Sequence, residues 1–311
     1  MVMMQKQKFM KPIDFEAAWK TKLSPFLKKK IAHAHLRYRE VSDVERDEYI
    51  RLITKSLLSK SVVSVGGHRR AQWQSGWAEN LDELTRTRKI SAIVPHYFGK
   101  HPVNRFSQRF VIGLHKDFEV GMLSILEYWV FEKYLKTVPI VYEFGCGTGH
   151  NLLRLRELNK GAELWGLDWV VSSQRLIQSV AKILHDSKLM AQRFDFFHPD
   201  KMFALDRRGA IFTMAALEQT GKRYKPFVNY ILKNKPALCV HIEPTGETLN
   251  PKHLLDFLSI EYFKKRKYLD GFIAYLRELE TRGKAKILSV QRSYIGSYYI
   301  DGYSIIVWKP L

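Results

Sequence analysis

Cysteine is scarce in this chain of 311 residues: Cys146 and Cys239 are the only two, and they are far apart. This excludes a disulfide framework and argues against a thiolate metal site. No apolar run approaches the about 20 residues that cross a membrane, and residues 1–15 lack the apolar stretch of a secretory signal. We therefore expect a cytoplasmic protein without a membrane span.

Acidic residues are also few, with 31 Asp and Glu against 51 Lys and Arg, which gives a net charge of +20. Residues 1–110 hold 22 basic and 10 acidic side chains. Such a field attracts nucleic acid, phosphorylated or carboxylated substrates, or an anionic membrane surface, although solubility alone explains it equally well. Acids are interspersed with bases in "REVSDVERDE" (39–48), so we predict a helix surface there and not a general nucleic-acid-binding surface.

The first third of the chain has the spacing of helices. Apolar residues recur at helical intervals between residues 15 and 61, and another amphipathic helix starts at Asp117. The glycine-containing segment 64–77 and the aromatic, basic segment 94–106 are predicted to be loops. We therefore divide the chain into a mainly helical region, residues 1–114, and a second domain, residues 115–311.

From Pro139 onward, short apolar runs alternate with segments long enough for a helix. Five strands are predicted, at residues 140–144, 162–168, 191–197, 209–217 and 236–244. Alternating strands and helices indicate a parallel sheet covered on both faces. Two further strands, 285–294 and 302–310, are joined by a short link and should be antiparallel. The predicted fold is therefore an α/β, Rossmann-like doubly wound sheet of seven strands whose last strand is antiparallel.

The stretch "YEFGCGTGHN" (142–151) places Gly145, Gly147 and Gly149 between the first strand and a helix from about Asn151. Glycines let the backbone approach a ligand closely, and the helix N-terminus offers free N–H groups. A Walker A loop and a dinucleotide fingerprint both require a glycine where His150 stands. Neither motif is therefore present.

The pattern E-x-G-x-G-x-G resembles motif I of the class I S-adenosylmethionine-dependent methyltransferases. The order of later features is similar too: an acid ends the second strand (Asp168), an Asp-Phe pair follows the third, and an antiparallel strand closes the sheet. The resemblance covers about residues 115–311. It implies S-adenosyl-L-methionine as cofactor and the following cofactor-binding residues: Glu143, Gly145, Cys146, Gly147, Gly149, Asn151, Asp168, Trp169, Asp195 and Phe196.

The resemblance also implies a role for several of these side chains. Glu143 would lie near the amino group or sulfonium of the cofactor, and Asp168 would bind the ribose hydroxyls. Trp169 would cover the adenine, and Asp195 with Phe196 would lie beside its amine. The alternative for Glu143 is an acid that satisfies the nearby helix N-terminus.

The segments "EFGCGTGHNLL", "GLDW" with "SSQRLI", "ALEQ", "ALCVHIEP" and "GYSIIVWKP" are similar to bacterial proteins described as sugar O-methyltransferases. This implies O-methylation of a polar sugar, glycan or other small molecule, which could be anionic. An RNA methyltransferase, favoured by the charge, is the second hypothesis, although no RNA-binding signature is visible. A non-catalytic cofactor-binding partner protein is the third. The oligomeric state is left open.

Candidate catalytic residues stand at the expected carboxyl ends of strands. His241 and Glu243, two apart, point to one face of their strand, as a His–carboxylate base requires. Glu218 is the second candidate base. Their alternatives are structural: a histidine bonded within the sheet and acids at helix starts. The three could also be metal ligands, but their spacing does not require it, so we assign no metal. His150 is interpreted as a contact to the cofactor.

Residues 1–114 should form a cap over the acceptor site. Its loop 94–106 and the bases after it supply Tyr97, Arg105 and Arg109 as candidate substrate-binding residues, because aromatic rings and arginine can stack on a sugar and pair with an anion. A loop packed over the sheet edge is the equal alternative. The run "KKRK" (264–267) is interpreted as a solvated helix face in preference to a phosphate-binding patch.

Overall fold

The alternation of apolar runs with helical segments produces the expected layered structure. A computed structural model describes residues 7–311, so part of the expectation about the chain's start concerns residues 1–6, which lie outside this range. Seven strands form one mixed sheet in the order β10-β12-β9-β8-β5-β6-β7. Their bounds are β5 Ile140–Phe144, β6 Glu163–Asp168, β7 Leu189–Arg193, β8 Ala210–Met214, β9 Leu238–Glu243, β10 Ala285–Arg292 and β12 Ser304–Pro310.

Strands β5 to β9 are parallel, as predicted. Strand β12 lies antiparallel between β9 and β10, which confirms the antiparallel last strand. The sheet thus follows the 3-2-1-4-5-6 order of dinucleotide-binding folds with one strand inserted before the sixth. Because β5 and β8 are neighbours that continue to opposite sides, their carboxyl ends flank the switch point at which such sheets bind ligands.

Side chains of each strand alternate between two cores. On one face, Val141 and Phe212 pack against helices α5 to α7, and on the other, Phe144 and Trp308 pack against α8 and α10. These helices, with α9, run as follows: α5 Phe118–Tyr134, α6 His150–Leu158, α7 Val171–Leu184, α8 Lys225–Asn234, α9 Leu254–Arg266 and α10 Phe272–Thr281. The expected start of a helix at Asp117 and of another near Asn151 is confirmed.

Residues 7–114 are mainly helical, as expected, but they also contain a sheet that the sequence did not indicate. The helices are α1 Pro12–Trp19, α2 Pro25–His33, α3 Asp43–Leu58 and α4 Arg70–Thr87. The small sheet has the order β1-β2-β4-β3-β11, with β1 Lys8–Phe9, β2 Arg37–Glu40, β3 Val103–Phe106, β4 Arg109–Gly113 and β11 Ile295–Gly296. Strand β11 comes from the far end of the chain, so this sheet joins the two predicted regions.

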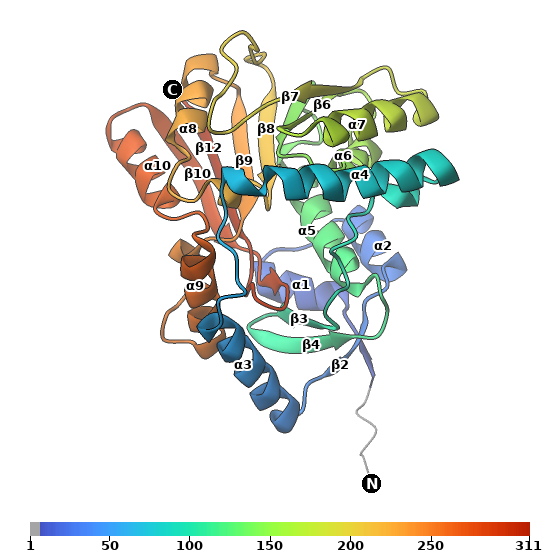
Figure 1. The fold of residues 1–311 in the computed structure, drawn as a ribbon, viewed down its shortest axis with the longest axis vertical. Coiled ribbons are helices and arrows are strands. Elements are labelled where there is room, and N and C mark those ends of the chain that lie inside the picture. The colour runs from blue at the N-terminus through green and yellow to red at the C-terminus, as the bar shows by residue number, and fades with distance from the viewer. Residues whose placement is uncertain (1–6) are drawn as a thin grey trace.

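Two segments predicted as loops are regular structure. Residues 64–77 contain a short 3-10 turn, η1 Gly67–Arg69, and the first half of α4, and residues 94–106 end in β3. Gly76 is tolerated inside α4 because its missing side chain faces open space. Figure 1 shows α4 crossing in front of the large sheet, with the small sheet below it.

The rest of the N-terminal region packs on helix α5. Trp19 of α1 stacks on Trp129 with ring centroids 4.2 Å apart, and its indole N–H donates to the Ser293 carbonyl at 2.7 Å. Helices α1 and α2 therefore extend the core beside the large sheet. Among residues 7–311, no helix is long and apolar enough to cross a membrane.

Candidate functional site

The glycine turn forms the floor of a cleft at the carboxyl ends of β5, β6 and β8. The amide N–H groups of Gly145 and Cys146 both donate to the Leu167 carbonyl, at 2.7 and 3.1 Å, which ties the turn to the end of β6. Gly145, Gly147 and Gly149 have φ of 73°, 53° and 80°, a left-handed conformation that glycine adopts without strain. This explains why the motif needs three glycines.

Asp168 ends β6 and points to the turn. Its carboxylate accepts the N–H of Gly147 at 3.0 Å and that of Val170 at 3.2 Å. Burial raises the pKa of Asp168 to about 6, although these two hydrogen bonds act to lower it. The charged form is therefore held in place beside the floor of the cleft, where a ligand hydroxyl could donate to it.

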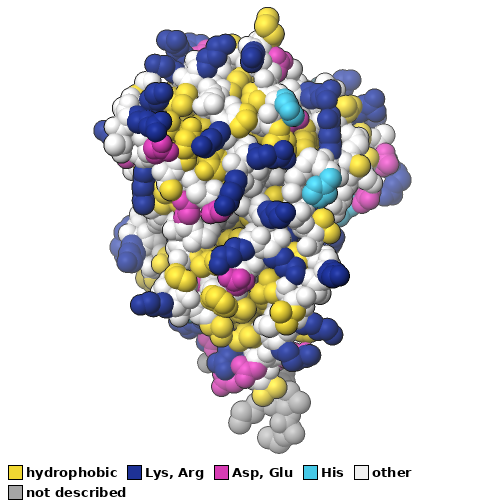
Figure 2. All heavy atoms as spheres, turned by 60° about the vertical axis from the view of Figure 1, so that its left-hand side comes forward, with side chains coloured by type: hydrophobic (Ala, Val, Ile, Leu, Met, Phe, Trp, Pro, Cys, Tyr) yellow, Lys and Arg dark blue, Asp and Glu magenta, His cyan; other side chains and the backbone are white. Residues whose placement is uncertain are grey.

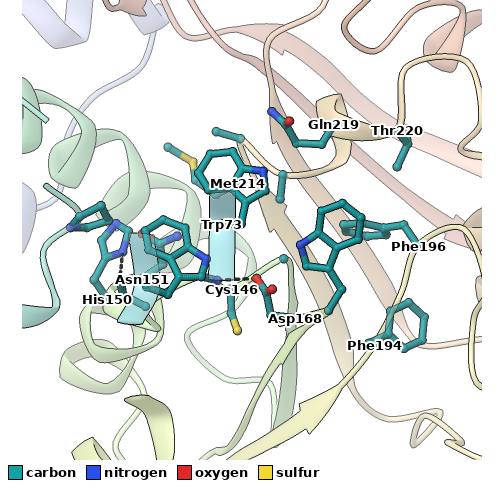
Figure 3. A pocket seen from close by; sticks show the side chains of 18 of the residues that line it. Trp73, Cys146, His150, Asn151, Asp168, Phe194, Phe196, Met214, Gln219 and Thr220 are labelled. Carbon is teal, nitrogen blue, oxygen red and sulfur yellow. Dashed lines mark hydrogen bonds between the residues drawn. The ribbon is translucent and has the colours of Figure 1, made fainter. Parts of the chain in front are cut away.

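Aromatic side chains make one end of the cleft. Trp169 follows Asp168, and Phe194, Phe196 and Phe197 follow β7. Figure 3 shows Asp168 between this end and the opposite end, which holds His150 and Asn151. A flat apolar ring would fit against the aromatic end. Of the pair predicted after β7, Phe196 lines the cleft.

Asp195, the other member of that pair, is not part of the cleft lining. One of its oxygens accepts the Phe197 N–H at 2.8 Å, and the other lies 3.6 Å from Nδ1 of His198. The structure thus gives this carboxylate the role of holding the turn that presents the phenylalanine rings.

Glu143 lies in the penultimate position of β5, fully buried. One carboxylate oxygen accepts the side-chain N–H of Asn151 at 2.7 Å, and the other has no hydrogen-bond partner within residues 7–311. Burial raises the pKa of Glu143 well above its usual range. An unsatisfied buried oxygen is costly; Glu143 does not itself line the cleft, whereas its partner Asn151 does.

Helix α4 closes the cleft from above, a feature the sequence prediction missed. Trp73 and Trp77, four residues apart, stack with ring centroids 5.4 Å apart and line the cleft. A Cβ on Gly147 would come within 2.9 Å of the Trp77 ring. The helix is held there by Arg70, whose guanidinium donates to the Trp169 carbonyl at 2.9 Å. The spacing of the two tryptophans was the signal that could have revealed this face.

The cleft has a volume of about 80 Å³. Ligand pockets for drug-sized molecules usually hold about 300–1,000 Å³. Trp73 and Trp77 are among the side chains that line this small volume, so a ligand of nucleoside size requires part of the lining to rearrange.

His150 begins α6 at the end of the cleft opposite the phenylalanines (Figure 3). Its Nδ1 lies 3.1 Å from the hydroxyl of Thr148, and among residues 7–311 no hydrogen bond engages its Nε2. Burial, and then the charge of Arg154, lower the pKa of His150 well below its usual value. The imidazole is thus neutral near pH 7. Met214, Gln219 and Thr220 also line the cleft and were not predicted.

His241 lies elsewhere. It is fully buried within β9, with Nδ1 2.9 Å from the Thr213 hydroxyl and Nε2 accepting the Trp308 indole N–H at 3.0 Å. Burial lowers the pKa of His241 to about 3. Both ring nitrogens are engaged and the ring does not line the cleft, so its surroundings favour the structural alternative over the base role.

Glu243 and Glu218 are likewise enclosed. The Glu243 carboxylate accepts backbone N–H groups of Ala216, Leu217 and Glu218 at 3.0–3.2 Å, which caps the 3-10 turn η3 Leu217–Thr220. Burial and the neighbouring Glu243 raise the pKa of Glu218 well above its usual range. Neither carboxylate lines the cleft. Within residues 7–311, Glu218, His241 and Glu243 also do not form a group of metal-ligand atoms.

The three candidate substrate-binding residues lie in different parts of the structure. Tyr97 lines the cleft beside Trp77. Arg105 is buried, and its guanidinium donates to the Leu255 carbonyl at 2.9 Å and the Ser259 hydroxyl at 2.7 Å. Arg109 is exposed on β4, against a different surface. Neither arginine lines this cleft, because β3 and β4 direct them into the small sheet and its surface; their role as substrate contacts stays a prediction.

No protein-family model matches the sequence, and no curated protein matches it. Among solved structures, the [4+2]-cyclase SpnF has a TM-score of 0.49 at 15% identity over 79% of this chain and 97% of its own. The O-methyltransferase NcsB1 from neocarzinostatin biosynthesis has a TM-score of 0.43 at 13% identity over 78% of this chain and 70% of its own. A SAM-dependent methyltransferase from Aquifex aeolicus has a TM-score of 0.42 at 14% identity over 59% of this chain and 88% of its own.

Proposed function

We propose that this chain is an S-adenosylmethionine-dependent methyltransferase that methylates an oxygen of a polar acceptor, a sugar, glycan or other small molecule. The observation that carries the proposal is Asp168, held at the end of β6 beside a three-glycine turn in an aromatic cleft. This arrangement offers, in one row, a surface for a purine, an acceptor for ribose hydroxyls and a close approach for a thioether or sulfonium.

The residues of the cleft fit that cofactor. Trp169 and Phe196 would flank the adenine, and Asp168 would accept the ribose hydroxyls, a charged acceptor worth about 1.5–3 kcal/mol. The unpartnered oxygen of Glu143 would accept from the amino group at the other end, directly or through Asn151. A Cβ on Gly145 would meet Ala216 at 2.4 Å and Phe196 at 3.4 Å, so glycine lets the turn pack directly against two other residues of the cleft lining.

The cofactor supplies a methyl group already activated by its sulfonium, so the chain must mainly align the acceptor and exclude water. Helix α4 and Tyr97 would cover the reacting end. An alcohol acceptor also needs a proton acceptor. His150 is the base we assign to that task, because its Nε2 is unengaged while Thr148 holds Nδ1. His241 and Glu243 would instead support the sheet and the η3 turn.

The RNA methyltransferase alternative rests on charge alone. Three arginines near the start of α3 pair with acids: Arg39 of β2 with Glu45, Arg46 of α3 with Asp47, and Arg51 of α3 with Glu48. These three side chains are therefore already engaged, although the N-terminal region keeps an excess of bases. A non-catalytic cofactor-binding role would keep the same cleft, and only turnover distinguishes it.

The experiment is a calorimetric titration with S-adenosylmethionine and with S-adenosylhomocysteine, alongside NAD and ATP. We expect both sulfur compounds to bind with a Kd on the order of micromolar, about −8 kcal/mol, and the nucleotides to bind far more weakly. Release of S-adenosylhomocysteine would then be followed with a panel of sugars and phenols. Binding of NAD or ATP but not of either sulfur compound would overturn the proposal.

A further inference from the structure

A second cavity of about 700 Å³ opens beside the cleft. Its walls are the loop 220–223 after η3, the end of α9 with the loop 267–270, and the turn η4 Gly246–Thr248. Val65 and Gly66 close it from the N-terminal region, where the Val65 N–H donates to the Arg266 carbonyl at 2.8 Å. We name this cavity the basic groove. Its volume lies within the about 300–1,000 Å³ of small-molecule sites.

Positive side chains dominate the rim of the basic groove. Both of its acids are already engaged: the Glu247 carboxylate accepts the N–H groups that begin α10, and Asp270 pairs with Lys222 at 3.2 Å. Arg223 and Lys267, both exposed, have no ion pair among residues 7–311. Two unmatched positive charges therefore border one cavity. Figure 2 shows Lys and Arg side chains standing around apolar patches on this side of the molecule.

The interior of the basic groove is apolar and aromatic. Phe263 and Tyr268 are buried and their rings lie 5.7 Å apart. The Arg266 guanidinium lies over the Tyr268 ring, 5.2 Å from its centroid. Nε of that guanidinium is buried without a hydrogen-bond partner within the described residues. The groove thus offers apolar contact at its base and positive charge at its rim.

The basic groove and the cleft adjoin each other at two residues. Thr220 lines both. Arg223 stands on the groove side with its guanidinium 4.3 Å from the ring centroid of Phe197, which lines the cleft. The loop between them is fixed, since Gly221 has φ of 59° and a Cβ there would come within 2.7 Å of the Lys267 carbonyl. Thr220, itself buried, therefore stands between the groove and the cleft.

We infer that the basic groove is the acceptor site, and that it binds a small molecule with an anionic group, phosphate or carboxylate, on an apolar body. The anion would lie between Arg223 and Lys267, and the body would lie on Tyr268 with its reacting oxygen directed past Thr220. This inference rests on the proposed function for the identity of the reaction, but not for the binding of the anion. The run 264–267, interpreted from sequence as a solvated face, would then supply part of a site.

The test uses phenyl phosphate, benzoate and benzyl alcohol, which share a ring and differ in charge. Binding to the full-length protein is measured by NMR titration, with and without saturating S-adenosylhomocysteine. We expect the two anions to bind and benzyl alcohol to bind much more weakly. The stronger of the two anions identifies phosphate or carboxylate as the preferred group. Anion affinity should fall as salt is raised, because exposed charges are screened.

The decisive variant is Arg223→Gln with Lys267→Gln. We expect about a tenfold loss of phenyl phosphate affinity for the two charges together, because exposed pairs are individually weak. The matched control is Lys100→Gln with Arg109→Gln, which removes the same net charge from exposed positions away from the groove. That control should retain affinity within about twofold, the change expected of a screened distant charge.

Four outcomes would overturn the inference: equal losses in both double variants, equal binding of benzyl alcohol, displacement of phenyl phosphate by S-adenosylhomocysteine, or tighter binding of an RNA oligonucleotide that the groove variant abolishes. The first two mean that no anion site exists, the third places the anion in the cleft, and the fourth assigns the groove to RNA. Failure of the proposed function would look different: S-adenosylhomocysteine would not bind, while phenyl phosphate binding and its loss in the groove variant would persist.

Discussion

The glycine turn and helix α4 face each other across the same cleft, yet they are specified in different ways. The turn is determined by its own residues, since three glycines with positive φ and an acid at the end of the next strand suffice to shape it. Helix α4 contains Gly76 and follows Gly66 and Gly67, and its local signals favour a loop. It is stabilised by contacts with the β6–α7 connection and with α7, such as Arg70 with Trp169 and Ser172 with Gln74. One wall of the cleft is thus determined by local sequence, whereas the opposite wall depends on tertiary packing.

The largest expected effect on cofactor binding concerns the turn side. Asp168→Ala should weaken S-adenosylhomocysteine binding by about 1.5–3 kcal/mol, because the ribose hydroxyls lose a charged acceptor. Calorimetry measures the change. Asp195→Ala, which removes a carboxylate outside the cleft lining, is the matched control and should lose much less. If the two variants lose equal affinity, the assignment of Asp168 to the ribose is wrong.

His241 and His150 are expected to have different roles, the first in the stability of the fold and the second in the chemistry. His241→Ala should lower the free energy of unfolding by about 1–3 kcal/mol, since the Trp308 indole N–H is left buried without an acceptor. Denaturant unfolding measures this loss. His150→Gln should change stability little and, once an acceptor is known, reduce turnover by about 10²–10⁴-fold. A large loss of turnover in a folded His241→Gln variant, with His150→Gln active, would reverse the assignment.

The contact between the two walls can be measured directly. Gly147→Ala should weaken cofactor binding and stability by about 1–2 kcal/mol, the usual cost of a left-handed alanine, and should add a clash with Trp77. Trp77→Ala in the same chain should relieve the clash but not the backbone cost. A double-mutant cycle isolates the coupling. Strictly additive effects would mean that α4 does not press on the turn.

The smallest expected effect is a pH dependence. The pKa of Asp168 is raised to about 6 in the free protein, above the usual value of about 3.9. Its charged form accepts the ribose hydroxyls, so cofactor affinity should be constant above pH 7 and fall up to tenfold for each unit below pH 6. The same raised pKa makes the free fold lose stability as pH rises from about 4 to 6 and no further above it. Affinity that is flat from pH 5 to 8 would contradict this role.

The large sheet was predictable because its signals are local. Strand β5 was placed at its observed bounds, and the β5–α6 turn and the antiparallel β12 were placed correctly. Each depends on residues adjacent in sequence: an apolar run, a turn glycine or a short link. Even the misplaced end of β7, which stops at Arg193 and not at Phe197, left Phe196 in the cleft.

The sequence by itself determined the strands, the glycine turn and the acid that faces it, because backbone conformation and side-chain alternation are properties of neighbouring residues. Only the tertiary structure decided which side chains share a cavity. His241 and Arg105 carry reactive groups, but burial beside Trp308 and Ser259 gives them structural partners. Trp73 and Trp77 show no motif, yet packing brings them to the cleft, and it places Arg223 on the Phe197 ring at the cleft's edge. Such proximity depends on how whole elements bury their apolar faces, which no local pattern encodes.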